Sequence, residues 1–337
     1  MLKKININYF FSILLLVALQ SIMNVAVAAK EFNVAVSGTK GGGQYVLAKE
    51  FSEQLSKLTD GQYTAFLYLN SQLGDEQSTI NDAAMGLLDM SVVATNNISP
   101  FSPIVGVLSL PYLIKTEEEA LKLVQSDFIK NEIVERVAKE AGVRIIGWDF
   151  TGFRSITNSK RPIKNLADLQ GLVMRVPKSK VLIETWNSWG INPSPLAWSE
   201  VYTALQQKVV DGQALPIHDI YNEKLYEYQK YLSKAHYNYL IQPLVISESI
   251  YQDQPADIQK KIVEAGTLAS LKNFEWGKEN KKIAEDMLAS KGVEIISDMD
   301  ESEMERRSVG GVWPKYYDEY GKDVVENILT VLGRNPT

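Results

Sequence analysis

The stretch from Pro255 to Ser290 constrains the fold more than any other part of the chain, because its pattern is almost continuously helical. A typical helix of a globular protein has about 10–14 residues. A helix of this length therefore predicts a molecule with two lobes that the helix braces, which suits a chain of 337 residues with 45% hydrophobic content. One apolar stripe at helical spacing is formed by Ile258, Ile262, Ala265, Leu268 and Leu271.

Strand-like and helix-like segments alternate through the rest of the chain. This order is typical of βαβ units and predicts a largely parallel sheet. The expected strands are residues 31–37, 63–69, 89–95, 143–150, 153–159, 173–177 and 293–297. The expected helices are residues 47–58, 77–88, 181–189 and a pair within 117–141, and the C-terminal region is also expected to be helical.

The N-terminus has the pattern of a secretory signal peptide. Lys3 and Lys4 are followed by the apolar run from Phe10 to Leu19, and then by small residues around Ala28 and Ala29. The alternative is a membrane anchor, but a span needs about 20 apolar residues, and this run is shorter. We therefore expect residues 1–29 to be removed near Ala28 or Ala29 and the mature protein to be periplasmic.

Several kinds of chemistry lack the residues they need. The net charge of −6 argues against a nucleic-acid surface, and the absence of cysteine removes thiolate chemistry and cysteine zinc sites. The glycine-rich loop from Gly38 has Gln44 and Tyr45 where a phosphate-binding loop needs lysine and serine or threonine. The two histidines, His218 and His236, provide too little for a transition-metal site. We predict no metal and no cofactor.

Two arginines interrupt apolar, strand-like segments. Arg175 lies within GLVMRVP, and Arg154 lies within GFRSIT. A guanidinium stays charged, so a buried one needs an anionic partner. That partner is either a ligand or an Asp or Glu of the chain itself, and the strand pattern does not decide between them.

Several segments resemble the solute-binding subunits of TRAP transporters, the tripartite ATP-independent periplasmic type. The match follows the family's order over most of the mature chain, and the combination is specific although each piece alone is weak. The matching segments are SQLGDE at 71, LPY at 110, GFR and TNSKRPI at 152–163, LADLQGLVMRVP at 166–177, NPSPLAWSEVYTALQ at 192–206, VVDGQ at 209–213 and QKYLS at 229–233.

The resemblance implies roles for five of the candidate residues. Arg175 corresponds to the arginine that clamps the ligand carboxylate with two parallel hydrogen bonds, a geometry that suits the planar guanidinium. Arg154 matches a second arginine of the same cleft, and Trp198 matches an aromatic position that packs on the ligand, with core packing as the alternative. Gln77 and Tyr45 fall at the starts of helices that face the cleft.

The chain departs from the family at DGQALP. The family usually has DGQENP, and its asparagine donates a hydrogen bond to the ligand, whereas this chain has Ala214 and Leu215. A leucine cannot supply that bond, and an unpaired polar group of a ligand is costly. Leu215 therefore argues against a sialic-acid-like ligand and favours a small organic acid with an apolar flank, while dicarboxylates stay possible.

The resemblance implies an α/β fold class, that of a two-lobe periplasmic binding protein with mixed sheets flanked by helices. We expect lobe I at residues 30–151 plus 241–280, and lobe II at residues 152–240 plus 281–337. The expected function is capture of a small organic carboxylate between the lobes and delivery to a TRAP membrane permease driven by an ion gradient. The protein is expected to be a monomer and not an enzyme. The alternatives are a ligand-sensing periplasmic module and an exported enzyme with His218 or an acid as base.

Overall fold

The computed structural model describes residues 29–335, and the expected signal peptide and its cleavage site lie outside them. An eight-stranded sheet runs through the whole described part of the molecule, in the order β10-β8-β4-β9-β3-β1-β2, with β7 paired to β4. Short strands β5 and β6 form a separate pair. The strands are β1 (Lys30–Val36), β2 (Tyr63–Tyr68), β3 (Met90–Val92), β4 (Val143–Asn158), β5 (Arg175–Val176), β6 (Ser194–Pro195), β7 (Gly212–Pro216), β8 (Tyr231–Ser233), β9 (Tyr239–Ser247) and β10 (Glu294–Ile296).

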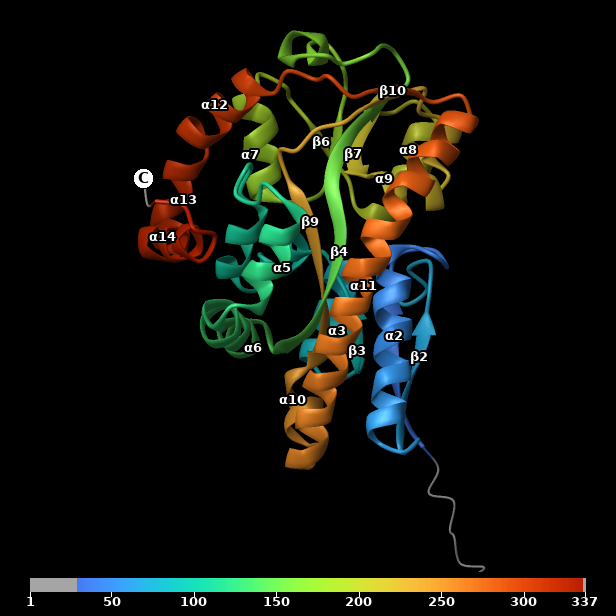
Figure 1. Ribbon diagram of the computed structural model, residues 1–337, viewed down its shortest axis with the longest axis vertical. Coiled ribbons are helices and arrows are strands. Elements are labelled where there is room, and N and C mark those ends of the chain that lie inside the picture. Colours follow the sequence, from blue (N-terminus) through green and yellow to red (C-terminus); the bar gives the residue numbers. More distant parts are fainter. Residues whose placement is uncertain (1–28, 336–337) are drawn as a thin grey trace, which may run out of the picture.

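Helices pack around this sheet along its whole length (Figure 1). They are α2 (Gly43–Leu58), α3 (Glu76–Ala84), α4 (Thr95–Ile98), α5 (Glu117–Gln125), α6 (Glu135–Ala141), α7 (Lys180–Ser188), α8 (Val201–Gln206), α9 (Ile217–Asn222), α10 (Glu248–Gln252), α11 (Ala256–Ser290), α12 (Ser302–Gly311), α13 (Trp313–Tyr320) and α14 (Lys322–Val331). Short helical turns connect them at η1 (Pro103–Ser109), η2 (Ile129–Val134), η3 (Leu166–Leu169), η4 (Trp198–Glu200) and η5 (Leu225–Glu227).

Strand β4 belongs to both lobes, as its length in Figure 1 shows. Its first part pairs with β9, up to Phe153 opposite Tyr239, and its last part, from Arg154, pairs with β7 and β8. We predicted two strands here, at 143–150 and 153–159, and the structure has one. The interruption is a bulge at Gly152, whose φ of +114° is open only to glycine.

The sheet is mixed and not largely parallel. Strand β1 is parallel to β2 and β3, and β8 is parallel to β10. The two long strands, β4 and β9, pair only in the antiparallel sense. Strand β4 pairs with β7, β8 and β9, and β9 also pairs with β3. The expectation from strand–helix alternation was therefore wrong for the strands that cross between the lobes, while the two-lobe α/β fold with mixed sheets is confirmed.

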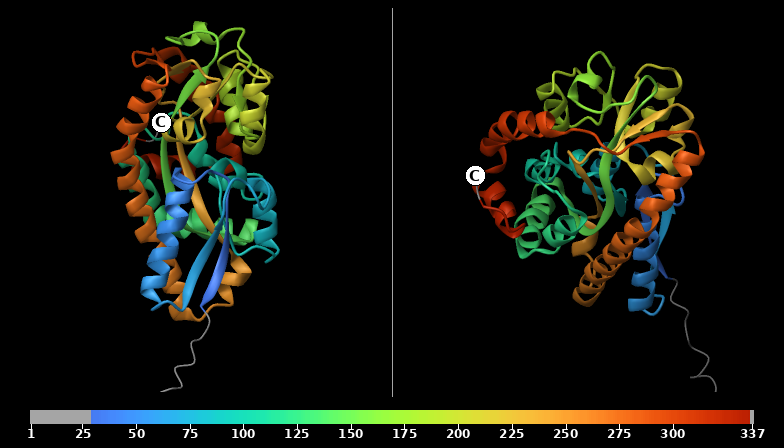
Figure 2. Two further views of the ribbon diagram at one scale, coloured as in Figure 1. Left: turned by 90° about the vertical axis from the view of Figure 1, so that its right-hand side faces the viewer. Right: turned by 45° about the horizontal axis from the view of Figure 1, so that its top comes forward.

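Helix α11 runs alongside β4 and spans both lobes, as predicted (Figures 1 and 2). The predicted apolar stripe is buried at Ile258, Ile262 and Ala265, but Leu268 and Leu271 are each 37% exposed. Small residues face the sheet in their place: a Cβ atom added at Gly266 would overlap the carbonyl oxygen of Ile146. Close contact between this helix and the strand leaves no room for leucine on that face.

The C-terminal helices divide between two hydrophobic clusters. Met304 of α12 packs with Trp186 of α7 and with Trp189 directly after that helix, in the half of the molecule that contains β7. Trp313 of α13 and Ile328 of α14 pack instead in the cluster that contains η1, α5 and α6. The prediction had placed the whole segment 281–337 with lobe II, and this packing divides it.

Candidate functional site

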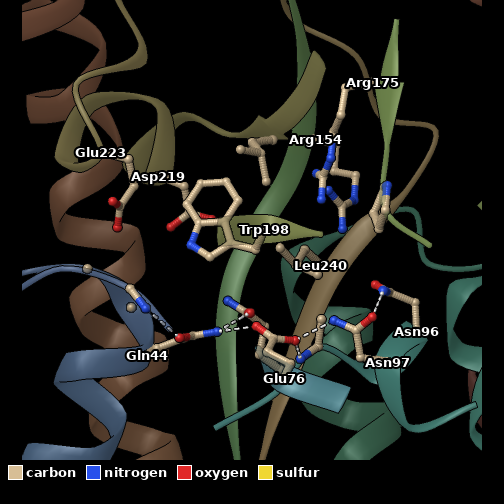
Figure 3. A pocket seen from close by; sticks show the side chains of 17 residues that line it. Gln44, Glu76, Asn96, Asn97, Arg154, Arg175, Trp198, Asp219, Glu223 and Leu240 are labelled. Carbon is tan, nitrogen blue, oxygen red and sulfur yellow. Dashed lines mark hydrogen bonds between the residues drawn. The ribbon is translucent and has the colours of Figure 1, made fainter. Parts of the chain in front are cut away.

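A pocket lies between the glycine-rich loop with α3 on one side and β5, η4 and α9 on the other. Figure 3 shows its polar side chains pointing toward one another across the cavity. The lining consists of Gly38, Gly42, Gly43, Gln44, Glu76, Ala94, Asn96, Asn97, Arg154, Arg175, Pro177, Trp198, Leu215, Asp219, Glu223, Leu240 and Gln242.

Arg175 on β5 is 3% exposed and lines the pocket. Its Nε and Nη2 atoms donate to the carbonyl oxygen of Leu196, at 3.1 and 2.7 Å. Within residues 29–335 no Asp or Glu oxygen lies within 4.0 Å of it. Burial, followed by the nearby charge of Arg154, lowers the pKa of Arg175 to about 9. The guanidinium therefore has no carboxylate counter-ion within the part of the chain that the structure describes.

Arg154 on β4 is 2% exposed and lines the same pocket. Nε donates to Oδ1 of Asn238 at 3.0 Å, and Nη1 donates to the carbonyl oxygen of Ala214 at 2.8 Å. It too forms no ion pair with any part of the described chain, and burial lowers its pKa. Two buried guanidinium groups that share a cavity and have only neutral acceptors form a site for an anion.

Glu76 organises one wall of the pocket. Its carboxylate accepts hydrogen bonds from Gln44 Nε2 at 3.1 Å, from the backbone nitrogen of Ala94 at 2.7 Å and from Asn97 Nδ2 at 2.6 Å. Gln44 also donates to Gln242 Oε1 at 2.7 Å. This network fixes side chains from α2, α3, α4 and β9 in one orientation, and it uses most of the acceptor capacity of Glu76.

Two further carboxyl groups lie across the pocket from the arginines (Figure 3). Asp219 is in the first turn of α9, and Glu223 follows that helix. Glu223 Oε1 accepts from the backbone nitrogen of Thr39 at 2.8 Å and from its Oγ1 at 3.0 Å, which joins α9 to the glycine-rich loop. Burial raises the pKa of Asp219 well above its usual range, and the charges of Asp149 and Glu223 raise it further.

The remaining contacts of the cavity are apolar. Leu215 on β7 and Leu240 on β9 line it directly. Trp198 begins η4 and borders three cavities: this pocket, a smaller one beside Arg175 and an open groove beside Ser37 and Thr39. The indole therefore lies between this pocket and the open groove.

Four of the six predicted site residues meet in this pocket, namely Arg154, Arg175, Trp198 and Leu215. Gln77 lines the smaller cavity beside Arg175, and Tyr45 is absent from the lining of either cavity. Their preceding neighbours, Gln44 and Glu76, line the main pocket instead, because α2 and α3 point their first residues inward. That shift of one residue is within the precision with which a sequence pattern locates a helix start.

Sequence reasoning missed Asp219, Glu223, Asn96, Asn97 and Gln242. Glu223 and Asp219 have the appearance of ordinary charged residues of a short helix, where an acid in the first turn is common. Nothing in the local pattern around Asn96, Asn97 and Gln242 distinguishes them from polar residues of loops and strands. Their position in the pocket depends on contacts between distant segments.

The histidines lie elsewhere. His218 is in a second cavity behind β4, against Trp276 with ring centroids 5.1 Å apart, and burial lowers its pKa to about 4. The side chain of His236 is 61% exposed and contacts Glu301. Among residues 29–335, no three side chains of His, Asp or Glu lie close enough together to hold a metal ion. No helix in the same part of the chain is long and apolar enough to cross a membrane.

Comparison with known proteins gives a consistent result. The sequence profile described as "Bacterial extracellular solute-binding protein, family 7" matches residues 37–319. The chain is 28% identical to the 2,3-diketo-L-gulonate-binding periplasmic protein YiaO of Escherichia coli, over 85% of this chain and 87% of that protein. It is 31% identical to the sialic acid-binding periplasmic protein SiaP of Vibrio cholerae, over 70% and 74% of the two chains.

Solved structures agree with the sequence relatives. A TRAP periplasmic solute-binding protein of Haemophilus influenzae with bound L-gulonate has a TM-score of 0.84 and 29% identity, with 90% of this chain and 99% of that chain covered. Another of the same type, from Polaromonas and bound to D-erythronate, has a TM-score of 0.85 and 25% identity, with 89% and 98% covered.

Proposed function

Because the chain belongs to family 7 of the bacterial extracellular solute-binding proteins, the solute-binding subunits of TRAP transporters, we propose that it clamps the carboxylate of a small organic acid between Arg175 and Arg154. It is a periplasmic transport component and not an enzyme, and it works with membrane permease subunits. The observation that carries the proposal is the pair of buried arginines without a carboxylate partner within residues 29–335.

The chemistry of the pair fits a carboxylate. A guanidinium presents parallel N–H groups that match the two oxygens of one carboxylate, and each charge-assisted hydrogen bond contributes roughly 1.5–3 kcal/mol. Micromolar affinity requires about 8 kcal/mol. Two arginines plus the face of Trp198 can supply that amount. The similar proteins with bound L-gulonate and D-erythronate support a small organic acid as the ligand.

The finer points of the proposal concern domain motion and processing. We propose that lobe I comprises residues 30–151 plus 241–280, that lobe II comprises 152–240 plus 281–337 with the C-terminal helices packed across the boundary, and that the lobes close on the ligand. The mature protein is proposed to be a monomer that begins after cleavage near Ala28 or Ala29.

The test uses Arg175→Met, which keeps most of the side-chain volume and removes the charge. The ligand-stripped, refolded protein is screened by thermal shift against mono-, di-, keto- and sugar carboxylates, and hits are measured by calorimetry. The variant should lose at least 100-fold in affinity for every hit, with a melting temperature close to wild type in the absence of ligand.

Arg136→Ala is the matched control, because that arginine is exposed and pairs with Glu140 on the surface. It should bind as wild type does. Affinity within a few-fold of wild type for Arg175→Met would remove the proposed clamp. Loss of uptake in a knockout strain separates transport from a purely sensory role.

A further inference from the structure

The two ends of the pocket carry opposite charge. Arg154 and Arg175 form one end, while Asp219 and Glu223 lie at the other (Figure 3). A third carboxyl group, that of Asp149, is fully buried behind the lining and accepts a hydrogen bond from the lining residue Gln242 at 3.0 Å. A ligand whose carboxylate is held by the arginines must therefore extend toward an acidic end.

Among the described carboxyl groups that line this pocket, Asp219 is the one whose side chain accepts no hydrogen bond. Glu76 receives three hydrogen bonds and Glu223 receives two, both from neutral donors. The Asp219 side chain has no hydrogen-bond or ion-pair partner among residues 29–335, although it lines the cavity and is only partly exposed. A carboxyl group in this position needs a donor, and the space in front of it belongs to the ligand.

Leu215 and Asp219 both belong to the pocket lining, and Leu215 has no polar group for a ligand. Strand β7 ends at Pro216 and α9 begins at Ile217, so Leu215 and Asp219 reach the cavity from consecutive elements. Leu215 offers no polar contact at the end of the strand. The polar groups that this lobe presents to the far part of a ligand are therefore Asp219, in the first turn of α9, and Glu223, directly after that helix.

We propose that Asp219 determines specificity, by selecting monocarboxylates that carry a hydrogen-bond donor, a hydroxyl or an ammonium group, at the end remote from the carboxylate. This inference deepens the function proposed above and rests on it. A dicarboxylate is disfavoured, because its second carboxylate would meet Asp219 and Glu223, and no Lys or Arg among the described residues lines that end of the pocket. A plain fatty acid of the same length is disfavoured because it leaves Asp219 unpaired.

The experiment compares acids of equal chain length that differ only at the remote end. One set is 4-hydroxybutanoate, 4-aminobutanoate, butanoate and succinate, and a second set is gluconate against glucarate. Affinities for ligand-stripped wild-type protein are measured by calorimetry. The hydroxy or amino acid of a set should bind at least 10-fold more tightly than the matched dicarboxylate and the unsubstituted acid. The hydroxy and amino arms identify which donor the pocket takes.

Asp219→Asn is the decisive variant, because it keeps the size of the side chain and adds a donor. It should bind dicarboxylates more tightly than wild type and reduce the donor preference at least 10-fold. Glu227→Gln is the control: its carboxylate lies near the same helix but bonds to Tyr202, outside the pocket, and it should preserve the wild-type ratios.

The outcomes separate the two proposals. If carboxylates bind in a manner that depends on Arg175 but show no donor preference, or if Asp219→Asn leaves the ratios unchanged, the role of Asp219 is wrong while the carboxylate clamp stands. If binding of every acid is indifferent to Arg175→Met, the clamp itself fails.

Discussion

At the scale of single residues, the pocket keeps charged groups in places where the folded chain does not neutralise them. Among residues 29–335, Arg154 and Arg175 have only neutral acceptors, and Oδ1 of the fully buried Asp149 has no partner. Such groups reduce the stability of the ligand-free protein. Their retention fits a binding site in which stability is exchanged for recognition.

The Asp149 carboxyl group should make stability depend on pH. Burial raises its pKa from 3.8 to about 6, so the folded state holds this proton more tightly than the unfolded state does. The contribution to stability is fully present below about pH 4 and is lost as pH rises through 6, by about 3 kcal/mol in total. Asp149→Asn stays neutral and keeps an acceptor for Thr151 and Gln242. Its free energy of unfolding relative to wild type should therefore increase between pH 4 and pH 7.5.

Urea denaturation of the ligand-stripped proteins at several pH values measures this difference. A constant difference between Asp149→Asn and wild type would contradict the argument. The charge of Asp149 raises the pKa of Asp219. The double variant Asp149→Asn with Asp219→Asn therefore tests whether the two carboxyl groups titrate together.

Local chemistry made some site residues predictable and left others hidden. Arg154 and Arg175 were found because a charge within an apolar strand is a strong signal that needs no knowledge of the fold. Asp219 gave no such signal, because an acid in the first turn of a helix is ordinary. Gln44 and Glu76 were missed by one position in favour of Tyr45 and Gln77, since the pattern does not fix the first residue of a helix.

At the scale of elements, the contact between α11 and β4 defines how the lobes are connected. The length of α11 was clear from the sequence, whereas its buried face was only half predicted. Hydrophobic periodicity selects large side chains, but this seam is built from Gly266, Gly147 and Ser270, which permit close approach. The bulge at Gly152 was likewise taken for the end of a strand, because a glycine in a strand pattern also fits a turn.

Gly266→Ala should destabilise the protein strongly. The added methyl group would overlap the carbonyl oxygen of Ile146, so helix and strand must separate, with an expected cost of at least about 3 kcal/mol. Gly310→Ala is the matched control, since nothing lies within 4 Å of the added atom on α12. That variant should gain about 0.5–1 kcal/mol from the better helix propensity of alanine. Urea denaturation measures both, and a cost below 1 kcal/mol for Gly266→Ala would show that the seam is not close-packed.

At the scale of the whole molecule, the lobes are joined across the pocket mouth by contacts that involve no ligand. Glu223 accepts two hydrogen bonds from Thr39, and Asn222 Nδ2 donates to the carbonyl oxygen of Gly41 at 3.1 Å. These bonds connect the glycine-rich loop to the end of α9, the helix whose first turn carries Asp219. They exist only when the loop and α9 are close together.

Removal of this connection should favour the open form. Glu223→Ala is expected to weaken ligand binding about 10-fold, mainly through faster dissociation, because the closed form loses two charge-assisted hydrogen bonds. Stopped-flow kinetics with any acid identified in the screen, together with small-angle scattering of the ligand-free protein, test this. Glu227→Ala removes a bond within one lobe, to Tyr202, and should leave dissociation unchanged. An unchanged dissociation rate for Glu223→Ala would mean that this connection does not hold the lobes together.

The path of the chain through the sheet also has a consequence for biosynthesis. Strand β3 lies between β1 and β9, so the sheet of residues 30–92 keeps an unpaired edge until residues 239–247 arrive. Strand β4, synthesised earlier, needs the same late strand as its neighbour. The strand that joins β3 to β4 is therefore made after both of them, and the sheet cannot be completed before residue 247 has been synthesised.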